Sequence, residues 1–183
     1  LAYGPGEDPA EFRRQFADAI ANLDAWFDAS RSALGSKAVG RQQPFYLAFH
    51  EVDNVPLLSR YGDLCARLMQ AGLPDAAIPV NRPANRTGRV KVAIVSGFFY
   101  DQSVWTALLR GWCAHLDRSR FELHLLYTGL VVDAETAIAR SHATTWHQGL
   151  SGIAPWLAAI RGITPDILLY PDIGMDSMST QLA

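Results

Sequence analysis

The residues of this sequence that could do chemistry gather in short polar segments that follow apolar runs. Asp101, Gln102 and Ser103 stand at the end of the loop 97–103, directly after the apolar run 91–96. An aspartate can accept a proton, and a helix that starts near Gln102 offers unpaired amides and a partial positive charge. The loop lacks the glycine spacing of a phosphate-binding loop. The simpler alternative is that these three side chains only cap the helix.

A second polar pair follows the apolar run 121–127. Asp133 and Thr136 stand three residues apart, and their oxygens could orient a ligand at the end of that run. The same spacing is typical of an ordinary helix N-cap, in which the aspartate accepts hydrogen bonds from first-turn amides. Both roles stay open from the sequence.

A third group follows the run 166–170. Asp172 and Asp176 bring two carboxylates into one short loop, which is typical of an acid–base pair or of a magnesium-binding loop. Gly174 between them can take a positive φ and lets the backbone approach a ligand closely. This loop is therefore a third candidate for ligand contact.

The apolar runs predict strands, and the segments between them predict helices. The run 91–96 is short and rich in β-branched residues, as in a strand buried on both faces of a parallel sheet. The segment 103–116 changes to a helical period, and 121–127 returns to a strand, which makes one βαβ unit. The inward face of its helix is expected to comprise Val104, Leu108, Leu109, Trp112 and Leu116.

The same alternation continues to the end of the sequence. The further expected elements are helices at 133–141 and 150–161 and strands at 144–147 and 166–170. Strands that alternate with helices imply a mostly parallel sheet with right-handed crossovers. Because parallel strands end at one edge, the three polar groups are expected to meet there, where ligands bind in open α/β sheets.

The first part of the sequence is mainly helical. An apolar stripe predicts a helix from Pro9 to about residue 33, opened by Asp8 as N-cap. The aromatic segment 43–49 is expected to be extended, and a second helix follows from 54 to about residue 71. The proline-containing stretch 72–88 suits a linker. The expected domains are residues 1–89, mainly helical with the linker, and residues 90–183, an α/β domain.

The composition excludes several classes of protein. The 183 residues are 49% hydrophobic and 19% charged, as in a globular domain with a real core. A net charge of −2 provides no basic field for a nucleic acid partner. Cys65 and Cys113 lack the spacing of a metal or disulfide framework, which fits a reducing, cytoplasmic location. The sequence contains no apolar run of about 18 residues, which is the length that a membrane-spanning helix needs.

Two stretches carry a family resemblance. VAIVSGFFYDQSVW, followed after a helix by LDRSRFELHLLY, resembles the first βαβ unit of the catalytic region of glycosyltransferase family 41. That family contains the O-linked N-acetylglucosamine transferases, the SPINDLY-type O-fucosyltransferases and bacterial adhesin-type N-glucosyltransferases, and the resemblance implies an N-acetylglucosaminyl- or glucosyltransferase that uses a UDP-sugar. The block ITPDILLYPDIGMDSMSTQLA is similar to a later strand and loop of the family, so the resemblance covers roughly residues 90 to 183. It implies the Rossmann-like N-terminal half of a GT-B glycosyltransferase, preceded by a mainly helical segment and cut short at its C-terminus.

The resemblance also implies a reaction. Family members transfer a sugar from a UDP- or GDP-activated donor to a protein side chain with inversion, without a tightly bound cofactor or metal. The nucleotide is held mostly by a C-terminal domain of the same polypeptide, which is expected to lie outside these residues. The chain is thus expected to be the acceptor-side half, inactive alone, with that domain and a protein or peptide acceptor as its partners.

The resemblance assigns roles to the candidate residues. Gln102 stands where the family commonly has a catalytic histidine, and glutamine cannot act as a base at neutral pH. Asp101 beside it and His50, whose segment would lie near the cleft, are the other catalytic candidates. The residues expected to bind substrate are Ser103, Trp105, Asp133, Thr136, Asp172, Gly174 and Asp176. Trp105 directly follows the loop and is the tryptophan expected to expose its ring to a sugar.

Two other functions stay open. Gln102 in place of histidine favours a non-catalytic α/β protein-interaction module derived from such an enzyme. A flavodoxin-like or response-regulator-like domain would use acidic strand ends for phosphate or magnesium. That third function is disfavoured because the first strand is not followed by an acidic pair.

Overall fold

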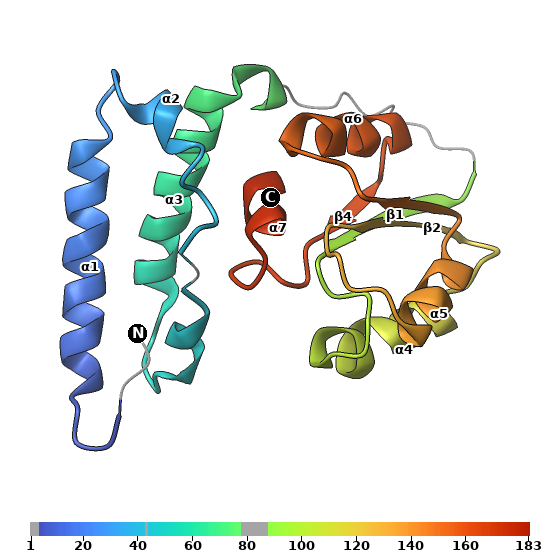
Figure 1. Ribbon diagram of the computed structural model, residues 1–183, viewed down its shortest axis with the longest axis horizontal. Coiled ribbons are helices and arrows are strands. Elements are labelled where there is room, and N and C mark those ends of the chain that lie inside the picture. The colour runs from blue at the N-terminus through green and yellow to red at the C-terminus, as the bar shows by residue number, and fades with distance from the viewer. Residues whose placement is uncertain (1–3, 43, 78–87) are drawn as a thin grey trace. The chain divides into compact units, whose positions relative to one another are not determined.

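The computed structural model describes residues 4–42, 44–77 and 88–183 of the chain. The chain divides into two compact units, residues 1–78 and residues 79–183 (Figure 1). Most of the predicted linker 72–88 lies outside the described residues. Each unit has its own apolar core.

Residues 79–183 fold around a four-stranded parallel sheet. Its strands are β1 (Val90–Ser96), β2 (Phe121–Tyr127), β3 (Thr145–Gln148) and β4 (Ile167–Leu169), in the order β3-β2-β1-β4. The ladders pair Val90 with Phe121 and Val92 with Ile167, so β1 lies between β2 and β4. The predicted α/β class with a parallel sheet is confirmed.

Helices cover both faces of this sheet (Figure 1). One face carries the π-helix η3 (Val104–Leu109), α4 (Arg110–His115) and α5 (Ala134–His142), and the other carries α6 (Ile153–Ile163) and α7 (Ser177–Leu182). Val92 and Ile94 of β1 belong to the first core, and Ala93 and Val95 to the second. The strand is apolar throughout because both of its faces are buried.

The helix after β1 differs from the prediction. Its first part is a π-helix, in which backbone amides donate to carbonyl groups five residues back. Trp105, Leu109 and Cys113 face the core and are fully buried. Leu108 and Trp112 remain 37% and 49% exposed, so their predicted inward positions are wrong. The physical reason is that a π turn takes up one more residue than an α turn and thereby rotates the rest of the helix.

Residues 1–78 form a small helical unit. Its elements are α1 (Pro9–Trp26), α2 (Ser32–Gly35), the 3-10 helices η1 (Pro44–Phe49) and η2 (Pro74–Ala77), and α3 (Val55–Gly72). Ile20 of α1, Leu47 of η1 and Leu64 of α3 meet in its core. The predicted start of α1 is confirmed, because Asp8 accepts a hydrogen bond from the Ala10 amide. Among the helices in the described ranges, none combines the length and apolar character needed to cross a bilayer.

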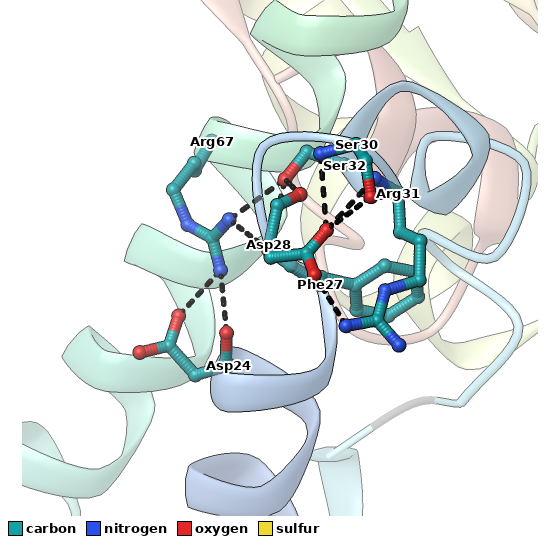
Figure 2. Close-up of polar contacts among 7 residues, drawn as sticks. All are labelled: Asp24, Phe27, Asp28, Ser30, Arg31, Ser32 and Arg67. Atoms are coloured by element: carbon teal, nitrogen blue, oxygen red, sulfur yellow. Dashed lines mark hydrogen bonds and ion pairs between the residues drawn. The ribbon is translucent and has the colours of Figure 1, made fainter.

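Helix α1 ends at Trp26, well before the predicted residue 33. Asp28 accepts a hydrogen bond from the Ser30 amide at 3.0 Å, which turns the chain out of the helix (Figure 2). Arg67 of α3 pairs with Asp24 at 2.6 Å and holds the end of α1 against α3. The overlooked signal is an aspartate two residues before a serine, which favours a turn over a continued helix.

Segment Pro44–Phe49 is a 3-10 helix, so the extended conformation predicted for this part of 43–49 is wrong. Proline fixes φ at a value that suits a helical turn as well as an edge strand. The aromatic rings contact one another, with the Phe45 and Phe49 centroids 5.6 Å apart. Aromatic composition suggested a strand, whereas this segment has no strand partner among the described residues.

His124 on β2 predicts a pH dependence of folding stability. The residue is 5% exposed, and its Nδ1 lies 2.8 Å from the Thr145 hydroxyl. Burial lowers the pKa of His124 below its ordinary value of 6.5; Lys91 and His147 act in the same direction, and Glu122 opposes them. The unfolded chain therefore takes up the proton first. Neutral His124 therefore contributes its full stabilisation above its unfolded-state pKa, and this stabilisation is lost as the pH falls through its folded-state pKa.

Urea denaturation of wild type and His124→Gln measures this effect. As the pH falls from about 7.5 to about 5.5, we expect wild type to lose more unfolding free energy than the variant. Burial also lowers the pKa of His142, but that group titrates in both proteins and cancels in the comparison. Equal losses in the two proteins would show that His124 is not responsible.

Candidate functional site

Within residues 79–183, the loops that follow β1, β2 and β4 meet at the carboxyl edge of the sheet. They span residues 97–103, 128–133 and 170–176. Hydrogen bonds connect loop 97–103 to each of the other two. Because β2 and β4 flank β1 on opposite sides, the chain changes direction across the sheet at this edge, which is where open α/β sheets bind ligands.

Asp172 ties the loop after β4 to the end of β1. Its side chain is fully buried, and its Oδ2 accepts from the Gly97 amide at 2.8 Å and from the Ser96 hydroxyl at 3.1 Å. Burial raises the pKa of the Asp172 carboxyl, against the opposing effects of the Gly97 amide and the neighbouring Ser179. A carboxyl enclosed in this way cannot reach a ligand, so the structure places Asp172 as a tie between loops.

Asp176 caps α7 and reaches the loop after β2. Its Oδ2 accepts from the Ser179 amide at 2.7 Å and from the Thr128 hydroxyl at 3.2 Å. A Cβ at Gly97 would lie 2.9 Å from Asp176 Oδ1, and a Cβ at Gly129 would overlap the Gly97 carbonyl oxygen. The Asp176 side chain thus occupies the space of a side chain at Gly97, and the backbones of the loops after β1 and β2 approach each other too closely for one at Gly129.

Asp133 begins α5 and holds loop 97–103 from the other side. Its Oδ1 accepts from the Thr136 amide at 2.9 Å, and the Thr136 hydroxyl accepts from the Asp133 amide at 3.2 Å, which is a capping box. Its Oδ2 accepts from the Asp101 amide at 2.8 Å. The pKa of Asp133 is lowered, first by the Asp101 amide and then by the Thr136 amide. Of the two roles left open by the sequence, the structure shows the N-cap.

The polar groups open to solvent at this edge come from loop 97–103. The Asp101 carboxylate is exposed and, within the part of the chain that the structure describes, makes no hydrogen bond or ion pair. Gln102 accepts from the Val104 amide through Oε1 and thus caps the following helix. Ser103 is exposed, with its hydroxyl 3.4 Å from Gln102 Oε1. Among these groups, Asp101 is the one able to accept a proton.

Trp105 offers no stacking surface, contrary to expectation. It is fully buried, with its ring edge-to-face against Phe99 at a centroid distance of 5.9 Å. Its Nε1 donates to Glu135 Oε2 at 2.7 Å, and Arg110 Nε lies 3.0 Å from the same oxygen. The Trp105 ring points inward and packs in the core between the helix and the sheet.

Gly174 and His50 complete the candidates. Gly174 has a φ of +83°, which favours glycine, and its amide donates to the Thr180 hydroxyl at 3.3 Å. His50 belongs to the other unit and is 4% exposed. It lines a cavity of about 750 Å³ together with Arg13 and Phe49, and this cavity includes none of the three loops at the sheet edge. Across residues 4–42, 44–77 and 88–183, no three His, Cys, Asp or Glu side chains are grouped to hold a metal ion.

Sequence reasoning missed several residues that organise the edge. Ser96 is the last residue of β1, and Thr128 directly follows β2. A polar residue at the end of an apolar run could have identified both, because the carboxyl edge lies there. Glu135 gave no such signal, since its bond to Trp105 joins residues that are 30 positions apart.

Comparison with known proteins indicates a fold. No protein-family model matches the sequence, and no curated protein matches it. A solved structure of a mutant O-GlcNAc transferase from Thermobaculum terrenum is similar, with a TM-score of 0.50 at 18% sequence identity. The likeness covers 66% of this chain and 24% of that one. The chain therefore spans about a quarter of that structure and shares its α/β fold there.

Proposed function

We propose that this chain is the acceptor-side half of an inverting, nucleotide-sugar-dependent protein glycosyltransferase of the family 41 type. The observation that supports this best is the carboxyl edge of the sheet, where three joined loops leave the Asp101 carboxylate open to solvent. The sequence resemblance of residues 90–183 and the fold shared with part of an O-GlcNAc transferase support the same function.

In this proposal, Asp101 accepts the proton of the acceptor side chain. The acceptor hydroxyl attacks the anomeric carbon of the sugar, the bond to the nucleotide diphosphate breaks, and the hydroxyl proton passes to a base. Asp101 directly precedes the position where the family commonly has histidine. Its backbone is fixed by the 2.8 Å bond to Asp133, so its carboxylate is carried on a supported loop. His50 is a weaker candidate because it is buried in the other unit.

The departing diphosphate needs positive groups, and none of the open side chains of loop 97–103 is basic. In this proposal they come from a second Rossmann-like domain of the same polypeptide, which holds the UDP- or GDP-sugar. The 183 residues alone would then bind acceptor but not donor.

Calorimetric titration of UDP and GDP tests this division. We expect no binding to this chain and binding to the full-length gene product. Tight binding to this chain alone would contradict the assignment of the nucleotide to another domain. Absence of binding to either protein would contradict the transferase and favour the function below.

A non-catalytic protein-interaction module is the second candidate. Gln102, where the family commonly has histidine, caps a helix and cannot act as a base. In the loop after β2, Leu130, Val131 and Val132 are 88%, 49% and 69% exposed. Consecutive exposed apolar side chains on a hydrogen-bonded loop suit contact with another protein.

A further inference from the structure

The helix that follows β1 carries two apolar faces, and one of them packs on the sheet. In the observed arrangement, Trp105, Leu109 and Cys113 are fully buried, while Leu108 and Trp112 are 37% and 49% exposed. An α-helix through the same residues would place Leu108 and Trp112 on the face of Trp105. The reason is that α spacing brings together residues that are three, four and seven positions apart.

Polar contacts hold α4 in its observed rotation. Arg118 donates to the carbonyl oxygen of Cys113 at 3.1 Å and to the carbonyl oxygen of His142 in α5. Arg110 Nε lies 3.0 Å from Glu135 Oε2, also in α5. If the π turn became an α turn while Trp105 stayed in place, α4 would rotate by one residue position, about 100°. That rotation would break the contact between Arg118 and the Cys113 carbonyl.

We propose that the helix 104–115 has two registers and that Arg118 selects the observed one. In the second register, Trp112 turns toward the core and Cys113 turns into the groove between α4 and α5. That groove has a volume of about 420 Å³, and its lining includes the small residues Gly111 and Ala114 beside the larger Arg110, His115 and His142. The exchange brings the larger Trp112 to the core in place of Cys113, at a packing cost that disfavours this register, and leaves the Trp105 anchor intact. It does not depend on the proposed glycosyltransferase function.

Thiol modification of Cys113 tests the proposal. The chain has two cysteines, so a Cys65→Ser background leaves Cys113 alone to react with Ellman's reagent. We expect Cys113 to react through a local opening, faster than global unfolding permits and almost independently of low urea concentrations. Arg118→Ala should accelerate the reaction by about tenfold or more, because a hydrogen bond from a charged group is lost.

Arg120→Ala is the matched control. Arg120 lies in the same turn, but its guanidinium stacks on the Phe121 ring at 5.4 Å, and within the described part of the chain its side chain makes no hydrogen bond or ion pair with α4. We expect its removal to leave the rate of Cys113 modification unchanged. Equal acceleration by both arginine variants would overturn the selective role of Arg118.

Deletion of the exposed Ala107 gives a second, opposite test. Without this residue, Trp105, Leu109 and Cys113 stand three and four positions apart, so a regular α-helix keeps the observed face inward. Cys113 should then react slowly whether or not Arg118 is present. The proposal would be overturned if Cys113 in both wild type and Arg118→Ala reacted only as fast as global unfolding allows, with the full urea dependence of unfolding.

The comparison of wild type with Arg118→Ala is sufficient even if the deletion variant does not fold.

Discussion

Asp172→Ala is expected to lower the free energy of unfolding of residues 79–183 by about 2–5 kcal/mol. The substitution leaves the Gly97 amide and the Ser96 hydroxyl, both at buried positions, without the acceptor that lies 2.8 Å and 3.1 Å from them. A buried donor without a partner costs about 1–3 kcal/mol. Urea denaturation followed by circular dichroism measures the loss.

Asp172→Asn is the matched control. Its amide oxygen can still accept both hydrogen bonds, and the side chain has nearly the same shape without the charge. Because burial raises the pKa of Asp172, the charged form is the unfavourable one in the folded protein. We therefore expect the asparagine variant to lie within about 1 kcal/mol of wild type.

The pH dependence of this pair has a definite sign. The pKa of Asp172 is raised above 3.8 in the folded protein, so protonated Asp172 stabilises the fold fully below pH 3.8. This stabilisation is lost as the pH rises through the folded-state pKa. Asp172→Asn should therefore gain stability relative to wild type over that interval. An asparagine variant as unstable as the alanine variant would show that the charge, rather than the acceptor, stabilises this edge.

In the full-length protein, Asp101→Asn is expected to lower kcat by about 100-fold or more with little change in KM. Asparagine has nearly the size of the Asp101 side chain, but it cannot take up the proton of the acceptor hydroxyl. The contact from the Asp101 backbone amide to Asp133 is retained, so the loop itself should be unchanged. Initial rates of sugar transfer at saturating donor and acceptor measure the effect.

Asp117→Asn is the control for this activity test. Asp117 is an exposed carboxylate in the turn before β2, at the opposite edge of the sheet. It accepts from the Ser119 amide and hydroxyl, so its neutralisation removes a charge without touching the loops after β1, β2 and β4. Equal rates for Asp101→Asn and wild type would remove Asp101 from the mechanism.

The sheet was predictable because its signals are local. The strands at 91–96 and 121–127 were predicted to within one residue, since runs buried on both faces contain few polar residues. The start of α1 was predictable from Asp8 and Pro9, whose effects reach only one helical turn. Parallel pairing followed from the alternation of strands with helices.

The failures have tertiary causes. Spacing alone favours Leu108 and Trp112 as inward residues, but the bond from Trp105 to Glu135, a residue 30 positions away, accompanies a different rotation. The same holds at the candidate site. Sequence position brought Asp101, Asp133 and Asp172 to one edge, yet it could not show which carboxylate is buried and which is open. That distinction depends on backbone amides that come from other loops.

The ties at the carboxyl edge also affect the order in which the domain folds. Asp172 reaches Gly97 across 75 residues, and Asp133 reaches Asp101 across 32. Closing a longer chain loop costs more entropy, so the tie from Asp172 is expected to form after β1 and β2 have paired. By the same reasoning it opens early when the protein fluctuates, and hydrogen exchange at the Gly97 amide would report that opening. The loop after β4 can thus separate transiently from loop 97–103, which opens the candidate ligand-binding site, while β1 and β2 stay paired.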